Sequence, residues 1–150
     1  MDRIERTYVV AVGKAAAGMA RAAADALGDR LVAGVVTSGA ADDFDKRWRR
    51  FPASHPLPSD GSEAAGRAAL ALAARVTDSH ALLLVCLSGG ASAMLAVPAP
   101  GLTLDDKRRT SQAMLVAGLD IGAMNVVRRH LSAVKGGQLA AAAFQTVTLE

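Results

Sequence analysis

The chain has 150 residues, 51% hydrophobic and 21% charged, a balance typical of one globular domain with a real core. Its net charge of +3 is spread along the sequence and only 3% of the residues are aromatic, which does not favour a nucleic-acid surface. The single cysteine, Cys86, lies in an apolar run, so the sequence excludes a disulfide framework and predicts a reducing compartment. With no leader and no apolar run of membrane-spanning length, we expect a cytoplasmic protein without a membrane span.

The first part of the chain alternates predicted strands and helices. The β-branched run at residues 8–12 predicts a strand that ends at Gly13, and the Ala-rich residues 14–27 predict a helix that stops at Gly28. Leu31–Thr37 predicts a second buried strand, closed by Ser38 and Gly39. A charged loop at residues 42–50 then leads to a short extended piece.

The middle of the chain contains a proline-rich turn, a helix and the most apolar run of the sequence. Prolines forbid a helix in the stretch FPASHPLP at residues 51–58. Asp60 and Glu63 have the spacing of a capping box, which predicts a helix that runs to about Val76. The continuous apolar run Ala81–Leu87 is expected for a central parallel strand covered on both faces.

The last part predicts two helices and one more strand. Thr103 and Asp106 repeat the capping signature and open a helix to about Gly118. A further helix is predicted over residues 122–134, before Gly136 and Gly137, and residues 145–148 read as a strand. This alternation predicts a single α/β domain over residues 1–150, a three-layer α/β/α sandwich with a mostly parallel, Rossmann-like sheet. Ligands bind such sheets at the carboxyl ends of the strands, where residues 13–14, 54–58 and 88–92 lie.

The stretch LSGGASAML at residues 87–95 follows the most apolar strand. Neither Ser88 nor Ser92 has the Gly-x-Ser-x-Gly frame of a nucleophile elbow, which argues against a serine hydrolase. Adjacent glycines instead allow backbone amides to converge on an anion, with a packing corner as the alternative. We predict that this loop joins the end of a central strand to a helix, close to Gly13 and Lys14 on a neighbouring strand.

Lys14 and the helix predicted at residues 122–134 add basic groups. A lysine at a helix start is electrostatically misplaced unless it faces an anion, and the alternative is a lysine in solvent. Asn125, Arg128, Ser132 and Lys135 recur at spacings of three and four, which predicts one polar helical face opposite Met124, Val127, Leu131 and Val134. His130 falls nearer the apolar side and is interpreted as a structural histidine at the core edge. The polar face suits phosphate groups, with a solvated helix face as the alternative.

Four segments in order give the sequence a recognisable family pattern, namely VVAVGKAAAGMA, SHPLPSDGSEAAGRAAL, LLLVCLSGGASAML and NVVRRHLSAVKGGQLA. Together they resemble the N-terminal part of the MOFRL-type glycerate 2-kinases, whose members are often labelled hydroxypyruvate reductase. The resemblance runs from about Tyr8 to Leu139. It implies ATP-dependent phosphorylation of the 2-hydroxyl of D-glycerate to 2-phosphoglycerate, with a divalent metal such as Mg²⁺.

The resemblance also assigns site residues. Lys14 matches the family's active-site lysine and is the expected catalytic residue. The expected residues for substrate and nucleotide are Gly13, Ser54, His55, Ser88, Gly89, Gly90, Ser92, Asn125, Arg128, Ser132, Lys135, Gly136 and Gly137. No metal ligand is assigned.

The chain departs from the family in length. Family members have a helical stretch before the first strand, an acidic metal-type motif just after the point where this sequence stops, and a second domain. We therefore expect a fragment that binds ATP without turning over, with the C-terminal domain or a second copy as partner. The alternatives are a non-catalytic α/β remnant that binds phosphate or a partner chain, and a nicotinamide-dependent reductase. The missing dinucleotide fingerprint disfavours the reductase.

Overall fold

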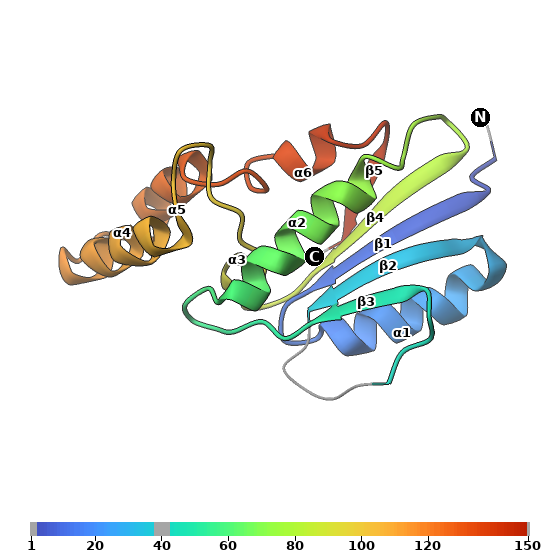
Figure 1. Ribbon diagram of the computed structural model, residues 1–150, viewed down its shortest axis with the longest axis horizontal. Coiled ribbons are helices and arrows are strands. Elements are labelled where there is room, and N and C mark those ends of the chain that lie inside the picture. Colours follow the sequence, from blue (N-terminus) through green and yellow to red (C-terminus); the bar gives the residue numbers. More distant parts are fainter. Residues whose placement is uncertain (1–2, 38–42, 150) are drawn as a thin grey trace.

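A five-stranded parallel sheet forms the centre of the computed structural model, which describes residues 3–37 and 43–149 (Figure 1). The strand order is β3-β2-β1-β4-β5, so the chain winds outward from β1 in both directions. The strands are β1 (Arg6–Val12), β2 (Leu31–Thr37), β3 (Trp48–Phe51), β4 (Ala81–Leu87) and β5 (Thr146–Leu149). All four neighbouring pairs are parallel, which confirms the predicted Rossmann-like α/β fold. The predicted closing pair Ser38 and Gly39 lies outside the described residues.

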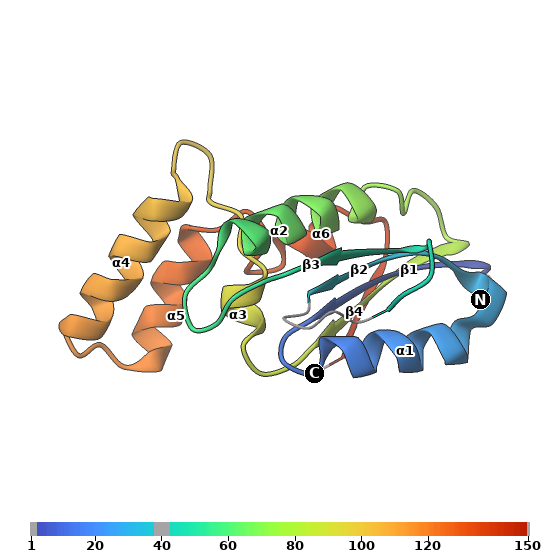
Figure 2. The same cartoon turned by 60° about the horizontal axis from the view of Figure 1, so that its bottom comes forward.

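Helices cover both faces of the sheet, as Figure 2 shows, with α1 on one side and α2 and α6 on the other. The bounds are α1 (Ala16–Leu27), a short 3₁₀ turn η1 (Gly28–Arg30), α2 (Asp60–Ala73) and α6 (Gln138–Ala141). Alternate residues of a strand point to opposite faces, so Val9 of β1 packs in the α1 layer and Val10 in the α2 layer. Burial on both faces explains why β1 and β4 are apolar almost without interruption. Cys86, from the apolar run of β4, is buried in the core, and burial raises the pKa of its thiol.

Two further helices project from the carboxyl edge of the sheet as an arm (Figure 1). This α4–α5 arm comprises α4 (Leu104–Val116), the turn at residues 117–120 and α5 (Ile121–His130). The one-turn helix α3 (Ala91–Met94) connects β4 to the segment that leads into the arm. The capping box predicted at Thr103 and Asp106 is present at the start of α4.

Three predicted boundaries are wrong. The N-cap of α2 is Ser59, which forms its capping box with Ser62, while Asp60 and Glu63 lie in the first helical turn. The helix ends at Ala73, three residues before Val76. The predicted loop at residues 42–50 ends earlier, because Trp48, Arg49 and Arg50 pair with β2 and belong to β3.

The helix predicted over residues 122–134 also ends early. It stops at His130 because the next residues pair with the chain before the arm. Ser132 forms an antiparallel bridge with Pro98, and the Ala133 amide donates to the Val97 carbonyl at 2.9 Å. This pairing carries the chain from the arm back to the sheet. Within residues 3–37 and 43–149, no helix has both the length and the apolar character needed to cross a membrane.

Candidate functional site

The loops that follow β1 and β4 lock together at the carboxyl edge of the sheet. The Lys14 amide donates to the Gly89 carbonyl at 2.9 Å, and the Ser88 amide donates to the Val12 carbonyl at 3.0 Å. The Ser88 hydroxyl accepts from the Ala15 amide at 3.0 Å and donates to the Val12 carbonyl at 3.3 Å. We call residues 13–15 with 88–90 the β1–β4 crossing. It confirms that the two glycine turns lie side by side on neighbouring strands.

Gly13 is required by the β1–β4 crossing. Its φ is +112°, and a Cβ there would lie 2.6 Å from the Ser88 carbonyl oxygen and closer still to the Ser88 hydroxyl. Only glycine tolerates both conditions. On the other loop, the amides of Gly89 and Gly90 have no hydrogen-bond acceptor among the described residues. The crossing therefore offers two unused backbone donors beside Lys14.

Lys14 lies two residues before the start of α1 and belongs to the β1–β4 crossing. Its side chain is exposed, and none of the described residues gives its ammonium group a hydrogen bond or an ion pair. The first turn of α1 contains no acidic residue to offset this charge. Lys14 thus lies beside a helix start and not inside the predicted helix 14–27, and its charge is uncompensated within the described part of the chain.

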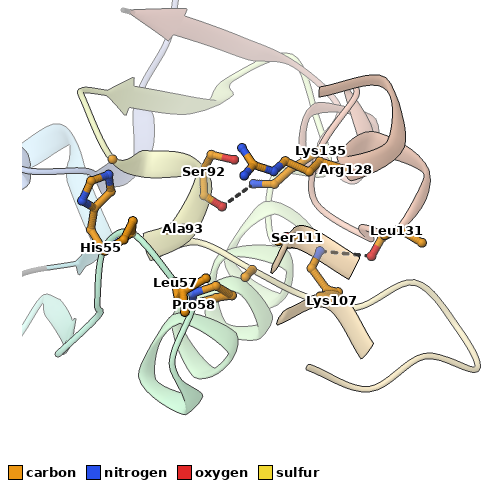
Figure 3. Close-up of a pocket in the computed structure, with 13 residues that line it drawn as sticks. His55, Leu57, Pro58, Ser92, Ala93, Lys107, Ser111, Arg128, Leu131 and Lys135 are labelled. Atoms are coloured by element: carbon orange, nitrogen blue, oxygen red, sulfur yellow. Dashed lines mark hydrogen bonds between the residues drawn. The ribbon is translucent and has the colours of Figure 1, made fainter. Parts of the chain in front are cut away.

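A compact pocket lies next to the crossing, between the proline-rich turn and the arm (Figure 3). We call it the His55 pocket, and its volume is about 240 Å³. Arg128 and Lys135 extend into it toward Ser92, and Lys107 lies across from His55. Its lining comprises His55, Pro56, Leu57, Pro58, Gly90, Ser92, Ala93, Ala96, Lys107, Ser111, Arg128, Leu131 and Lys135.

A larger pocket of about 680 Å³ lies on the other side of Arg128 and Lys135, toward β5. We call it the Gly136 pocket. Its floor is apolar, formed by Val85, Leu87, Leu95, Val134 and Leu139, and its rim carries Asn125, Arg129, Gly136 and Gly137. Ser92, Arg128 and Lys135 line both pockets and form their common wall.

Lys135 is half-buried in this common wall. Its ammonium group donates to the Ser92 carbonyl at 2.8 Å and to the Leu95 carbonyl at 3.3 Å, which fixes α3 against the returning chain. Desolvation by burial, followed by the positive charges of Lys107 and Arg128, lowers the pKa of Lys135 to about 8. The three cations therefore lie close enough to repel one another.

Lys107 is the functional candidate that the sequence interpretation missed. Residues 107–109 form a basic cluster of the kind that usually lies in solvent, but Lys107 is only 7% exposed. The helix signal was present: Leu104, Lys107, Ser111 and Met114 share the inner face of α4 at spacings of three and four. Burial lowers the pKa of Lys107, and the charge of Glu63 opposes this in part.

No carboxylate balances these charges in the lining. Neither pocket is lined by Asp or Glu. Among the described residues, the Arg128 guanidinium has no hydrogen-bond or ion-pair partner. Within the same residues no cluster of three or more His, Cys, Asp or Glu could hold a metal ion. The lining thus fits an anion and does not fit a Mg²⁺ ion held by protein ligands.

The structure brings together most of the residues predicted for the site. His55, Gly90, Ser92, Arg128 and Lys135 line the His55 pocket, and Asn125, Gly136 and Gly137 line its larger neighbour. The crossing holds Gly13, Lys14, Ser88 and Gly89 directly beside Gly90, outside both linings.

Three predicted polar residues have other surroundings. Ser54 lines neither pocket, and its hydroxyl donates to the Leu57 carbonyl at 2.6 Å within the proline-rich turn. Ser132 is fully buried behind the common wall, where its hydroxyl accepts from the Val134 amide. The predicted single polar helix face is therefore wrong, because Ser132 and Lys135 lie beyond the end of α5. His130 is exposed, and its Nδ1 contacts the Val126 carbonyl of its own helix, so its predicted place at the core edge is also wrong.

Comparison with known proteins gives a consistent family. The family described as a domain of unknown function, DUF4147, matches residues 1–149. A D-glycerate 2-kinase of Thermotoga maritima is 36% identical over 147 residues, which cover 94% of this chain and 34% of the relative. An Agrobacterium vitis protein named as a hydroxypyruvate reductase is 41% identical over 137 residues, 90% of this chain and 35% of the relative.

A solved structure supports the fold independently. The crystal structure of a glycerate kinase from Thermotoga maritima matches with a TM-score of 0.88 and 34% identity, covering 96% of this chain and 35% of that one. The chain thus spans about a third of the length of the relatives that it matches.

Proposed function

The chain belongs to the DUF4147 family of domains, and from this premise we propose that it forms the ATP- and D-glycerate-binding part of a glycerate 2-kinase. The observation that carries the proposal is that Lys107, Arg128 and Lys135 converge in the lining of the His55 pocket, which contains no carboxylate. Such a concentration of positive charge is unfavourable unless an anion occupies it. Because the relatives are named as glycerate kinases, we take this anion to be glycerate or the phosphate groups of ATP.

The chemistry of phosphoryl transfer suits these residues. The 2-hydroxyl oxygen of glycerate forms a bond to the γ-phosphorus of ATP, the bond from phosphorus to the ADP oxygen breaks, and the hydroxyl proton is lost. This reaction needs positioning and compensation of negative charge more than a covalent nucleophile. In our proposal Lys14 is the catalytic residue that stabilises the transferring group, and the free amides of Gly89 and Gly90 hold phosphate oxygens.

Mg²⁺ takes no assigned ligand in this proposal. The resemblance implies that the ion accompanies ATP, but the described residues do not fit a protein-held Mg²⁺ site. Without a carboxylate to hold the ion, the β- and γ-phosphates are poorly organised for transfer. We therefore predict that the 150-residue chain alone binds ATP without turnover.

Two other functions remain as outcomes of the test. One is a non-catalytic domain that binds phosphate groups or a partner chain. The other is a nicotinamide-dependent reductase, which the name of the Agrobacterium vitis relative favours. The β1 turn reads VGKAAA and not G-x-G-x-x-G, which argues against dinucleotide binding at that loop.

The first experiment compares ligands on the purified chain. Calorimetric titration with ATP and with NADH should show binding of ATP alone, weakening with added salt as the charges are screened. Lys14→Ala should lower ATP affinity about ten- to a hundredfold, the loss of one charged hydrogen bond. Lys46→Ala, which removes an exposed lysine far from the crossing, is the matched control.

The second experiment measures ADP release with ATP, Mg²⁺ and D-glycerate. We expect background release from the chain alone. Robust metal-dependent release would overturn the prediction that the chain binds without turnover, whereas binding of NADH in preference to ATP would replace the kinase proposal by the reductase. Unchanged ATP affinity in Lys14→Ala would remove Lys14 from the site.

A further inference from the structure

Two opposite sides of the His55 pocket are held by hydrogen bonds from one turn of α4. Lys107 donates to the Leu131 carbonyl at 3.0 Å, which holds the wall formed by the returning chain. Its neighbour Arg108 donates from Nε to the Pro58 carbonyl at 2.8 Å, which holds the wall formed by the proline-rich turn. Adjacent residues of α4 therefore fix the width of the pocket from inside the arm.

The donors that remain after these contacts match a carboxylate. An ammonium group has three N–H donors, and Lys107 uses one of them on Leu131. Arg128 has five donors and uses none on the described residues, whereas Lys135 already uses two on α3. A carboxylate has two oxygens with about four acceptor sites, so it fits the unused donors of Lys107 and Arg128.

The neutral side chains and the volume of the His55 pocket further restrict which ligands it can bind. The hydroxyls of Ser92 and Ser111 line the pocket and have no hydrogen-bond partner among the described residues. They suit a ligand that carries hydroxyl groups beside its carboxylate. The volume of about 240 Å³ lies below the roughly 300–1,000 Å³ of pockets for drug-sized ligands, whereas the Gly136 pocket at about 680 Å³ lies within that range.

We propose that the His55 pocket binds the carboxylate of a small hydroxy acid through Lys107 and Arg128, while the Gly136 pocket takes the nucleotide. The assignment rests on the proposed glycerate kinase function for the identity of the acid, and on the geometry for the pocket. Lys107 is then a substrate-binding residue that sets specificity for an acid over a neutral polyol. Arg128 and Lys135 in the common wall bring the two ligands together.

The test compares D-glycerate with glycerol, which has similar hydroxyls and lacks the carboxylate. Calorimetric titration of the purified chain should show glycerate binding and no glycerol binding at equal concentration. Lys107→Met keeps the length and apolar stem of the side chain and should lower glycerate affinity about ten- to a hundredfold. Affinity for a non-hydrolysable ATP analogue should change less than about twofold, a ratio of about 0.4 kcal/mol. Lys46→Met makes the same chemical change away from both pockets and should alter neither affinity.

A second variant covers the case in which Lys107→Met fails to fold. Ser111→Leu fills the pocket from the same helix face without removing a charge, and it should block glycerate while the ATP analogue still binds. Equal losses of glycerate and nucleotide affinity in both variants, or no loss of either, would overturn the pocket assignment. So would a wild-type chain that binds no small carboxylate.

One further ligand separates this inference from the proposed function. D-lactate has the carboxylate and the 2-hydroxyl but lacks the 3-hydroxyl of glycerate. Lys107-dependent binding of lactate at least as tight as that of glycerate would support the acid pocket and argue against glycerate as the substrate. Glycerate binding that is indifferent to Lys107 would leave the kinase proposal standing and sink the pocket assignment.

Discussion

The two parts of the site are held together by different kinds of bond. The β1–β4 crossing is joined by backbone amides, backbone carbonyls and one serine hydroxyl, all within two glycine turns. The second part is the lining of the His55 pocket, which we call the wall. It is held by long cationic side chains that donate to backbone carbonyls, from Lys107 to Leu131 and from Lys135 to Ser92. The crossing is therefore a rigid part of the sheet edge, while the wall depends on how the α4–α5 arm sits against the body.

This difference matters for function because the two parts respond to different perturbations. Backbone contacts do not titrate, so the crossing keeps its geometry across the physiological pH range. Lysine contacts depend on protonation and on screening by salt. The crossing is expected to control stability, and the wall is expected to control the pH and salt dependence of binding.

The largest expected effect comes from breaking the crossing. In Gly13→Ala the new Cβ meets the Ser88 carbonyl oxygen at 2.6 Å and the backbone must hold a φ of +112°. We expect the free energy of unfolding to fall by about 3 kcal/mol, as for other strained or clashing substitutions. Urea denaturation followed by circular dichroism measures the loss.

Gly89→Ala is the matched control on the facing loop. Its Cβ would meet no atom within 4 Å, and Gly89 is not among the glycines with positive φ. Its free energy of unfolding should change by less than about 1 kcal/mol in either direction. Equal losses in the two variants would show that the crossing is not the constraint.

The same division explains what could be predicted from the sequence. The β1–β4 crossing was predictable because each glycine turn directly follows an apolar strand, and neighbouring parallel strands place their ends together. The wall was not, because Lys107 looks like one member of a solvated basic cluster until the inner face of α4 is known. The end of α5 was missed for a related reason. The periodic pattern continues through Ser132 and Lys135, but pairing of Ser132 with Pro98 outweighs helix propensity.

The contribution of the wall lysines should be measurable as a pH dependence of anion binding. Lys135 has a pKa lowered to about 8 by burial and by the charges of Lys107 and Arg128, and only its protonated form attracts an anion. Glycerate affinity should therefore be full at pH 7 and fall by up to about tenfold by pH 9, as Lys135 and the neighbouring Lys107, whose pKa burial also lowers, lose their protons. Titration calorimetry at several pH values measures this.

Variants identify the group responsible. Lys135→Arg keeps the charge above pH 9 and should leave only the fall in affinity that deprotonation of Lys107 causes, because burial lowers the pKa of Lys107 as well. Lys135→Met should make the affinity low throughout. His55 also lines the pocket, so His55→Gln is measured alongside and should keep the wild-type pH profile. A wild-type affinity that stays constant from pH 7 to 9 would contradict a role for Lys135.

Stability responds to the same group in the opposite sense. In the unfolded chain Lys135 returns to its ordinary pKa of 10.5, so between about pH 8 and 10.5 the unfolded state binds more protons. The penalty of burying the charged lysine is present below pH 8 and is relieved as the pH rises through that window. Deprotonation of Lys135 at high pH thus stabilises the fold and weakens anion binding.

The smallest expected effects come from the helix caps and test whether the arm unfolds separately from the body. Ser59 caps α2 in the body and Thr103 caps α4 in the arm, each through a complete capping box. Ser59→Ala should lower the free energy of global unfolding by about 1 kcal/mol. Thr103→Ala should leave global unfolding nearly unchanged and raise amide hydrogen exchange in α4 about fivefold, the local equivalent of about 1 kcal/mol.

Glycerate affinity should then fall slightly in Thr103→Ala alone, because the arm carries Lys107 and Arg128. Equal shifts of the urea midpoint in the two variants, with no selective exchange in α4, would mean that arm and body unfold as one unit and that the wall is as rigid as the crossing.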